Sequence, residues 1–243
     1  MQASFKTSPT PNPAKILGII GGVSWHSSIE YYRLLNENTA KRLGSKHSAR
    51  LILNSLDFSK LLEWQKSKDQ RDLLNGFIEA GQALRASGCQ AFAIASHTLS
   101  CLGEQVERET GLAHISLYDA LFRRLRLLGV RRVALLGTLQ TMTEEKYQRI
   151  YRDAGFEVIV PVEPHLSNTA RIVYREITRG IFNSNSRNTF MDCIDSLAQK
   201  NVDAVVLGCT EIGLLVRERM LDSLPLVDLI EPHVEDCVNW LCT

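Results

Sequence analysis

The residues best suited to acid–base chemistry follow a short apolar run in the C-terminal part of the chain. The stretch VVLGCTEIG, from Val205 to Gly213, ends its apolar half abruptly in Cys209, Thr210 and Glu211. A cysteine thiol has an ordinary pKa of about 8.5, and nearby donors or a helix N-terminus can lower it so that the thiolate acts as a base. A helix is expected to begin near Glu211, with its N–H groups and positive dipole end directed at Cys209. The pattern predicts a strand that ends at a reactive cysteine.

A second polar cluster follows an apolar run in the first half of the chain. The stretch AFAIASHT ends in Ser96, His97 and Thr98. A serine hydroxyl is a much weaker base than a thiolate, because its alkoxide is not reached near neutral pH without help. His97 is either a base or an aid to Ser96, or it only ties down a loop. Ser96 and His97 therefore join Cys209 as the candidate catalytic residues.

The elements that carry these clusters alternate along the whole chain. Short runs rich in Val, Ile and Leu, such as KILGIIGG, RRVALLGT and LPLVDLI, are each followed by a longer segment of helical period. Continuous apolar strands that alternate with helices are typical of parallel sheets covered on both faces. The sequence predicts an α/β protein.

A weak internal repeat suggests that the chain has two similar halves. Aligning Gly21 with Gly137 sets GGVSWHSSIEYYRLL against GTLQTMTEEKYQRIY. The same offset, relaxed by three residues, places Ser96 opposite Cys209. Ligands of open parallel sheets bind outside the carboxyl ends of the strands. If the halves face each other, Ser96 and Cys209 meet across one cleft.

The predicted organisation is therefore two lobes related by a pseudo-twofold axis, with the active site in the cleft between them. Lobe one spans residues 16–115 and is completed by residues 225–243, and lobe two spans residues 116–224. Residues 1–15 contain Pro, Ser and Thr without an apolar core, which predicts a loose tail and no signal peptide.

Composition excludes several classes of partner. The 243 residues are 44% hydrophobic and 23% charged, and the net charge of +1 comes without a basic block. These values predict a globular protein that binds neither nucleic acid nor membranes. The cysteines form no C-x-x-C pair, which is compatible with a reducing cytoplasm. Five are expected to be structural: Cys89, Cys101, Cys193, Cys237 and Cys242.

Four stretches, taken in order, resemble the aspartate/glutamate racemase superfamily. They are ILGIIGGVSWHSSIEYYRLLNE, HSARLILNSLDF, LLGTLQTM and VVLGCTEIGLLV, and the resemblance runs from about Ile16 to the C-terminal helix. Its nearest branch is the aspartate racemases and broad-specificity amino-acid racemases. The resemblance implies two Rossmann-like lobes, a homodimer, and racemisation of an amino acid without pyridoxal phosphate, another cofactor or a metal. One base removes the Cα proton and an acid on the opposite face returns one.

The first lobe departs from the family pattern. Members with two cysteines have Cys-Asn-Thr where this chain has Ser96, His97 and Thr98, and a related branch has threonine at the first position. Three interpretations follow. Ser96 transfers the proton with help from His97 or water, His97 is itself the second base, or the protein exchanges or decarboxylates without efficient inversion. The first is the favoured one.

Candidate substrate-binding residues lie at the strand ends. The Gly21–Gly22 turn offers backbone N–H groups to a carboxylate, although it could be a simple tight turn. Glu211 would accept from the α-ammonium group or only place favourable charge at a helix start. Seven residues are expected to donate to the substrate through a hydroxyl or a backbone N–H group: Gly22, Val23, Ser24, Thr98, Thr138, Thr141 and Thr210.

An acidic substrate side chain requires a cation, for which three residues are candidates. Arg171 is preferred to Arg50 and Lys15, because ARIVYREI resembles a family segment that lines the cleft. His233, near the start of the last helix, has a packing role or a site role. Aspartate or a close acidic analogue is the expected substrate.

Two other classes of function stay open. One is a decarboxylase or a cis–trans isomerase of a dicarboxylate on the same scaffold, for which one cysteine suffices. The other is a non-catalytic bilobal ligand-binding protein.

Overall fold

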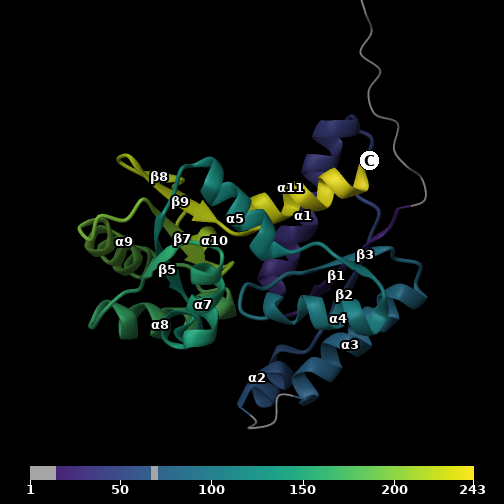
Figure 1. Ribbon diagram of the computed structural model, residues 1–243, viewed down its shortest axis with the longest axis horizontal. Coiled ribbons are helices and arrows are strands. Elements are labelled where there is room, and N and C mark those ends of the chain that lie inside the picture. The colour runs from purple at the N-terminus through teal and green to yellow at the C-terminus, as the bar shows by residue number, and fades with distance from the viewer. Residues whose placement is uncertain (1–14, 67–70) are drawn as a thin grey trace, which may run out of the picture.

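Two lobes lie side by side, each built on its own sheet (Figure 1). The computed structural model describes residues 15–66 and 71–243, so all but the last residue of the predicted N-terminal tail lies outside the described residues. In the described part, no helix combines the length and apolar character needed to cross a membrane. All six cysteines are free thiols.

Lobe one contains a four-stranded parallel sheet in the order β2-β1-β3-β4. The two central strands, β1 and β3, are buried along their whole length, as expected for apolar runs covered on both faces. The strands are β1 (Leu17–Gly21), β2 (Leu51–Ser55), β3 (Ala91–Ile94) and β4 (Ala113–His114). The helices are α1 (Trp25–Leu43), α2 (Phe58–Lys66), α3 (Arg71–Ala86), the short η1 (Ser100–Leu102) and α4 (Gly103–Thr110).

Lobe two contains a five-stranded sheet in the order β6-β5-β7-β9-β8, parallel except for the edge strand β8. Its strands are β5 (Arg132–Gly137), β6 (Glu157–Ile159), β7 (Ala204–Gly208), β8 (Met220–Leu221) and β9 (Leu224–Asp228). Its helices are α5 (Leu117–Leu127), α6 (Leu139–Thr143), α7 (Glu145–Asp153), α8 (His165–Arg175), η2 (Ile177–Arg179), α9 (Ser184–Ala198) and α10 (Ile212–Leu215).

The internal repeat is visible in the strand order. Each sheet places its first strand between its second and third, and a later parallel strand, β4 or β9, beside the third. Gly21 and Gly137 end the corresponding strands β1 and β5, while Ser96 and Cys209 follow the corresponding strands β3 and β7. The α/β class and the two-lobed architecture predicted from the sequence are confirmed.

The last helix, α11 (Ile230–Leu241), returns to lobe one. Its buried face, which includes Val234 and Val238, joins the same apolar cluster as Leu17 and Tyr31. The sequence assigned all of residues 225–243 to lobe one, but β9 pairs with β7 in the second sheet. Only α11 crosses back, because β9 buries Leu226 and Val227 against lobe two.

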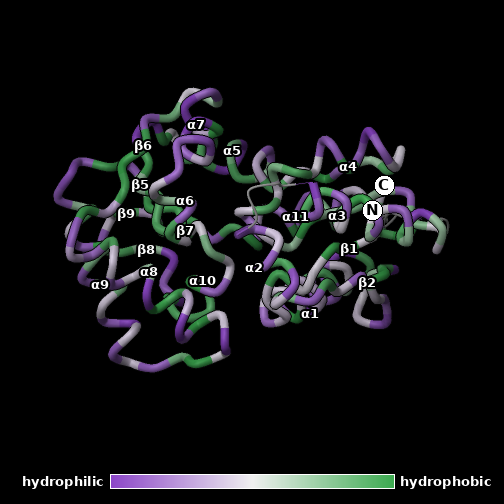
Figure 2. Tube along the Cα trace, turned by 90° about the horizontal axis from the view of Figure 1, so that it is seen from below, coloured by the Kyte–Doolittle hydropathy of each residue, from purple (hydrophilic) through white to green (hydrophobic). Residues whose placement is uncertain are grey.

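The helix α2 projects toward the space between the lobes in both overall views (Figures 1 and 2). The chain enters α2 three residues after the carboxyl end of β2. Side chains from this helix can therefore reach the region where the carboxyl ends of the two sheets meet.

Candidate active site

A pocket between the lobes brings together the two predicted polar clusters. The loop after β3 supplies three lining residues and the loop after β7 supplies three more, so each sheet contributes the carboxyl end of its third strand. All three candidate catalytic residues line this one pocket. The six residues are Ser96, His97, Thr98, Cys209, Thr210 and Glu211.

Ser96 and Cys209 each begin a helical turn. The backbone N–H of Ser100 donates to the Ser96 carbonyl at 3.1 Å, and that of Ile212 donates to the Cys209 carbonyl at 2.9 Å. The N–H of Leu99 also donates a long hydrogen bond of 3.4 Å to Ser96 Oγ. Free backbone N–H groups at a helical start favour negative charge. Both side chains therefore sit where partial positive charge is available.

The Cys209 thiol is bonded to a carboxylate. It is only 6% exposed, and its Sγ donates to Glu211 Oε2 at 3.0 Å. Burial raises the pKa of Cys209 well above its ordinary value, and the negative charge of Glu211 raises it further, while the N–H groups of Glu211 and Ile212 act in the opposite direction. The expectation of a lowered pKa is wrong for the substrate-free protein. The helix that follows, α10, is a single turn of four residues, and its N–H groups do not outweigh burial.

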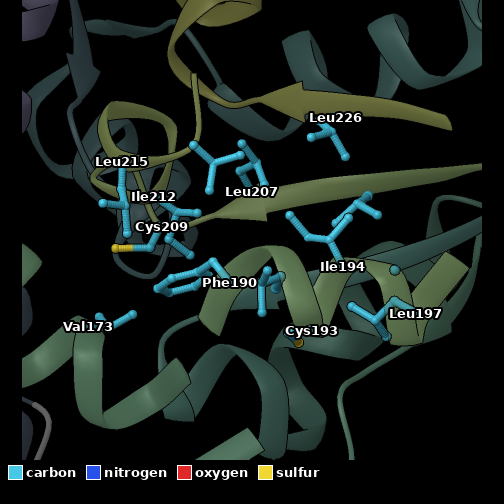
Figure 3. Packing of buried hydrophobic residues seen from close by; sticks show 14 of the residues in the cluster. Val173, Phe190, Cys193, Ile194, Leu197, Leu207, Cys209, Ile212, Leu215 and Leu226 are labelled. Atoms are coloured by element: carbon cyan, nitrogen blue, oxygen red, sulfur yellow. The ribbon is translucent and has the colours of Figure 1, made fainter. Parts of the chain in front are cut away.

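Behind the thiol lies the apolar core of lobe two. Cys209 belongs to the cluster that contains Phe190, Ile212 and Val173. Figure 3 shows Cys209 near Phe190, Ile212 and Leu215, beyond the end of the strand that carries Leu207. This packing explains both the low exposure of the thiol and the burial contribution to its pKa.

The Glu211 carboxylate is held by both lobes. Thr210 Oγ1 donates to Oε2 at 2.9 Å, and Ser27 Oγ, from α1 in lobe one, donates to Oε1 at 2.7 Å. Ser27 and Thr210 also lie 2.5 Å apart through their hydroxyl oxygens. Sequence reasoning did not identify Ser27, although it falls within the GGVSWHSS stretch. Donors from both lobes therefore fix the position of this buried carboxylate.

The loop of lobe one has a different set of partners. His97 is 2% exposed, and its Nε2 lies 2.7 Å from the Tyr151 hydroxyl of lobe two. Burial lowers the pKa of His97 to about 3, so its imidazole is neutral near pH 7. The side chain that could remove a proton from Ser96 thus has one ring nitrogen already engaged.

Three threonines connect the lobes beside this loop. Thr98 Oγ1 lies 3.4 Å from Thr138 Oγ1 and 3.3 Å from Thr141 Oγ1. Thr138 lines the pocket and caps α6, since it accepts from the Thr141 N–H at 3.2 Å. Thr141 is fully buried behind Thr138 and is not a lining residue, so its predicted direct contact with substrate is not supported.

The glycine turn does not present the expected free N–H group. The Gly22 N–H donates to Ser28 Oγ at 2.9 Å, and Gly22 is not a lining residue. Its φ is +81°, and a Cβ there would lie 2.0 Å from the Leu56 carbonyl oxygen, so glycine is required for the close turn itself. Ser24 is buried and also lies outside the lining. Val23 alone of these three residues lines the pocket.

Arg171 is not in the pocket either. Its half-exposed guanidinium pairs with Glu176 at 3.5 Å, and Val173 and Tyr174 of the same helix line the pocket instead. The alternative cations, Lys15 and Arg50, are likewise not lining residues. The segment ARIVYREI does reach the cleft, but its Arg171 forms an ion pair at the surface.

His233 has a packing role. Its Nδ1 lies 2.7 Å from the Tyr31 hydroxyl and its Nε2 donates to the Ile115 carbonyl at 2.8 Å, which joins α11 to α1 and to the chain after β4. Burial lowers the pKa of His233 to about 4. Both ring nitrogens of this neutral imidazole are satisfied.

The remaining lining residues were not identified from the sequence. Tyr174 Oη donates to Gln140 Oε1, and burial raises the pKa of this phenol. Helix α2 follows a strand end, which is the one sequence signal that could have indicated its contribution. The residues concerned are Phe58, Leu62, Gln65, Gln140, Val173, Tyr174, Thr178 and Gly208.

Across residues 15–66 and 71–243, no cluster of three or more His, Cys, Asp or Glu side chains could hold a metal ion.

Comparison with known proteins assigns this architecture to a family. A profile described as Asp/Glu/hydantoin racemase matches residues 20–237. The chain belongs to this racemase family. The match includes both strand-end loops and the pocket that they line.

Solved structures of similar proteins agree with the family assignment. A candidate Asp/Glu racemase from Yersinia pestis is 31% identical, with a TM-score of 0.84 over 94% of this chain and 100% of the other. An aspartate racemase homologue from Pyrococcus horikoshii OT3 is 27% identical, with a TM-score of 0.81 over 95% of this chain and 100% of the other. An arylmalonate decarboxylase, 15% identical with a TM-score of 0.53 over 94% of this chain and 93% of the other, shares the fold.

Proposed function

We propose that this member of the Asp/Glu/hydantoin racemase family interconverts the enantiomers of an amino acid without pyridoxal phosphate or a metal. The observation that carries the proposal is the meeting of Cys209 and Ser96 in one pocket, each at the start of a helical turn after the third strand of its lobe. Racemisation requires proton-transfer groups on opposite faces of Cα, and two facing lobes are suited to provide them.

Cys209 is the stronger base of the pair. Its thiol donates to Glu211, whose negative charge disfavours the thiolate. A substrate α-ammonium group bound near Glu211 would offset that charge and favour transfer of the thiol proton to solvent or to the carboxylate. Substrate binding itself would then help to generate the thiolate that removes the Cα proton.

Ser96 serves the opposite face. When the Cα–H bond breaks at Cys209, its electron pair moves into the substrate carboxylate and gives an enediolate-like intermediate. The Ser96 hydroxyl donates its proton to Cα from the other side, and the Leu99 N–H stabilises the oxygen while it takes a replacement proton from water. Cys209 releases the proton that it removed to solvent, which restores both groups. Thr98 lines the same pocket, and its hydroxyl would donate to the carboxylate as its charge grows, whereas the hydroxyl of Thr210 already donates to Glu211.

Aspartate is the substrate that we propose to test first, since aspartate racemases are the nearest branch by sequence resemblance. Among the described lining residues outside the two strand-end loops, the side chains that carry hydrogen-bond donors for a second carboxylate are all neutral: Gln65, Thr138, Gln140, Tyr174 and Thr178. Neutral amino acids therefore belong in the same panel. We retain the homodimer as a prediction, which light scattering after gel filtration would test.

The experiment is enantiomer-resolved exchange in D2O. Purified protein is incubated with L- and D-aspartate, L- and D-glutamate and neutral amino acids. NMR then follows loss of the Cα proton, and chiral chromatography follows inversion. Exchange accompanied by inversion is the expected result. A complete lack of both signals across the panel would contradict the racemase proposal.

Decarboxylation or cis–trans isomerisation is the second candidate, because one specific observation favours it. Cys209 is the only cysteine among the described residues that line the pocket, and either reaction can proceed with a single cysteine. Release of CO2 from a disubstituted malonate, or isomerisation of maleate, would indicate this chemistry if neither amino-acid signal appears.

A further inference from the structure

The ring of His97 comes from lobe one, but its contacts are with lobe two. Its Nε2 lies 2.7 Å from the hydroxyl of Tyr151 on α7. The ring also packs edge-on against Tyr118 of α5, with centroids 5.2 Å apart, and is tilted against Tyr151 at 5.9 Å. Two aromatic side chains of one lobe thus surround an imidazole of the other.

The backbone at the same position is also held by lobe two. The Tyr118 hydroxyl donates to the His97 carbonyl at 3.0 Å. Ser96 immediately precedes this residue and Thr98 follows it, and Thr98 contacts Thr138. The short segment that carries the Ser96 hydroxyl is therefore tied to the lobe that carries Cys209 rather than only to its own sheet.

His97 and His233, the two buried histidines among the described residues, differ in one respect. Both nitrogens of His233 have partners, whereas Nδ1 of His97 is buried without one. The tautomer decides the direction of the hydrogen bond to Tyr151: either Nε2–H donates to the hydroxyl, or the hydroxyl donates to the Nε2 lone pair. Burial among tyrosines disfavours the charged form and so preserves this arrangement.

We propose that His97 is a positioning residue that fixes the Ser96 hydroxyl relative to Cys209 through its hydrogen bond to Tyr151 and the hydrogen bond from Tyr118 to its carbonyl. The inference rests on the proposed racemase function. It assigns His97 neither to the substrate nor to proton transfer. Proton transfer depends steeply on distance, so a small displacement of Ser96 affects one face of the substrate and leaves the Cys209 face almost unchanged.

The test replaces Tyr151 by Phe and measures Cα exchange from each enantiomer separately in D2O. The enantiomer whose proton faces Ser96 is the one that Cys209→Ala still exchanges. In Tyr151→Phe, exchange from that enantiomer is expected to fall about tenfold, while exchange from the other enantiomer and both KM values change by less than about twofold. Equal loss from both enantiomers, or loss from neither, would overturn the proposal.

Tyr147→Phe is the matched control. Tyr147 is buried one turn earlier on α7, and its hydroxyl is not the partner of His97. Exchange should remain unchanged from both enantiomers. If Tyr151→Phe fails to fold, Tyr118→Phe removes the other interlobe hydrogen bond and must show the same preference for the Ser96 face, or the proposal fails.

A second readout needs no turnover and so separates this inference from the racemase proposal. Long-range ¹H–¹⁵N NMR of the histidine rings reports tautomer and charge. His97 should be neutral at pH 5, and its Nε2 signal should shift in Tyr151→Phe. A charged His97 at pH 5, or a signal that does not respond to Tyr151→Phe, would refute the arrangement even if the enzyme is a racemase.

Discussion

The loop after β3 and the loop after β7 share a backbone plan but differ in their ionisable neighbours. Each places its first residue, Ser96 or Cys209, at the start of a helical turn that supplies N–H groups. Cys209 then has the Glu211 carboxylate at hydrogen-bond distance, whereas Ser96 is followed by the neutral His97. The two loops thus share their backbone geometry, while the side chains proposed for proton transfer differ in kind.

This difference gives the two lobes unequal tasks. A thiol beside a carboxylate can be switched toward thiolate when a cation binds nearby, because its pKa responds strongly to local charge. A serine hydroxyl has no comparable route to an alkoxide near neutral pH, so its role depends on being accurately placed. The charged network around Glu211 and the aromatic contacts around His97 correspond to these two requirements.

The largest effect is expected from removing the thiol. Cys209→Ala should lower racemisation by at least about a thousandfold, in line with loss of a general base. Chiral chromatography measures the rate, and a thermal melt checks that the protein is folded. Cys101→Ser, at an exposed cysteine that does not line the pocket, is the control. An unchanged rate in Cys209→Ala would remove this residue from the mechanism.

A substitution that makes the two loops alike should raise the racemisation rate. Ser96→Cys introduces a thiol at the weaker position and is expected to raise the racemisation rate about tenfold, because a thiolate is a far better base than a serine hydroxyl. Initial rates at several pH values provide the measurement. A lower rate in Ser96→Cys would contradict the proposal that Ser96 acts only as an acid or base at this position.

The pair formed by Cys209 and Glu211 should set the pH dependence of Cα proton exchange. Thiolate formation makes exchange at the Cys209 face rise with pH, and because burial and Glu211 raise the pKa of Cys209, the rise should continue through pH 9. Glu211→Gln removes the negative charge, so the rise should move to lower pH. A profile that is flat between pH 6 and pH 9, or one that Glu211→Gln leaves in place, would contradict the role of this pair.

The smallest effect is expected at Arg171. It lies outside the pocket and pairs with Glu176 at the surface, so Arg171→Ala should change kcat and KM for every substrate by less than about twofold. Tyr174→Phe, three residues along the same helix and in the lining, should alter KM instead. A large rise in KM for aspartate in Arg171→Ala would restore the original prediction.

The sequence predicted the features that depend on strand ends. Apolar runs that stop at Ser96 and Cys209 indicated two corresponding positions, and parallel sheets require such positions to lie at one edge. The α/β class follows from the apolar runs, and the meeting of the two loops in one pocket required in addition that the two halves face each other, as the internal repeat suggested.

Features that depend on tertiary partners were not predictable. Ser27 reaches Glu211 only because α1 of lobe one lies against the loop of lobe two. The raised pKa of Cys209 depends on burial by the core around Phe190, which no local pattern reveals. Gly22 was misread because an N–H at a strand end can be satisfied by a nearby hydroxyl, here that of Ser28.

The most direct test of the central claim is the exchange pattern of Ser96→Ala in D2O with each pure enantiomer. The account predicts that Cys209 continues to exchange the Cα proton of one enantiomer without inversion, while the other enantiomer loses exchange and racemisation stops. Cys209→Ala should give the complementary pattern, with weak exchange confined to the other enantiomer. Full racemisation by Ser96→Ala would contradict the assignment of Ser96 and Cys209 to opposite faces of the substrate.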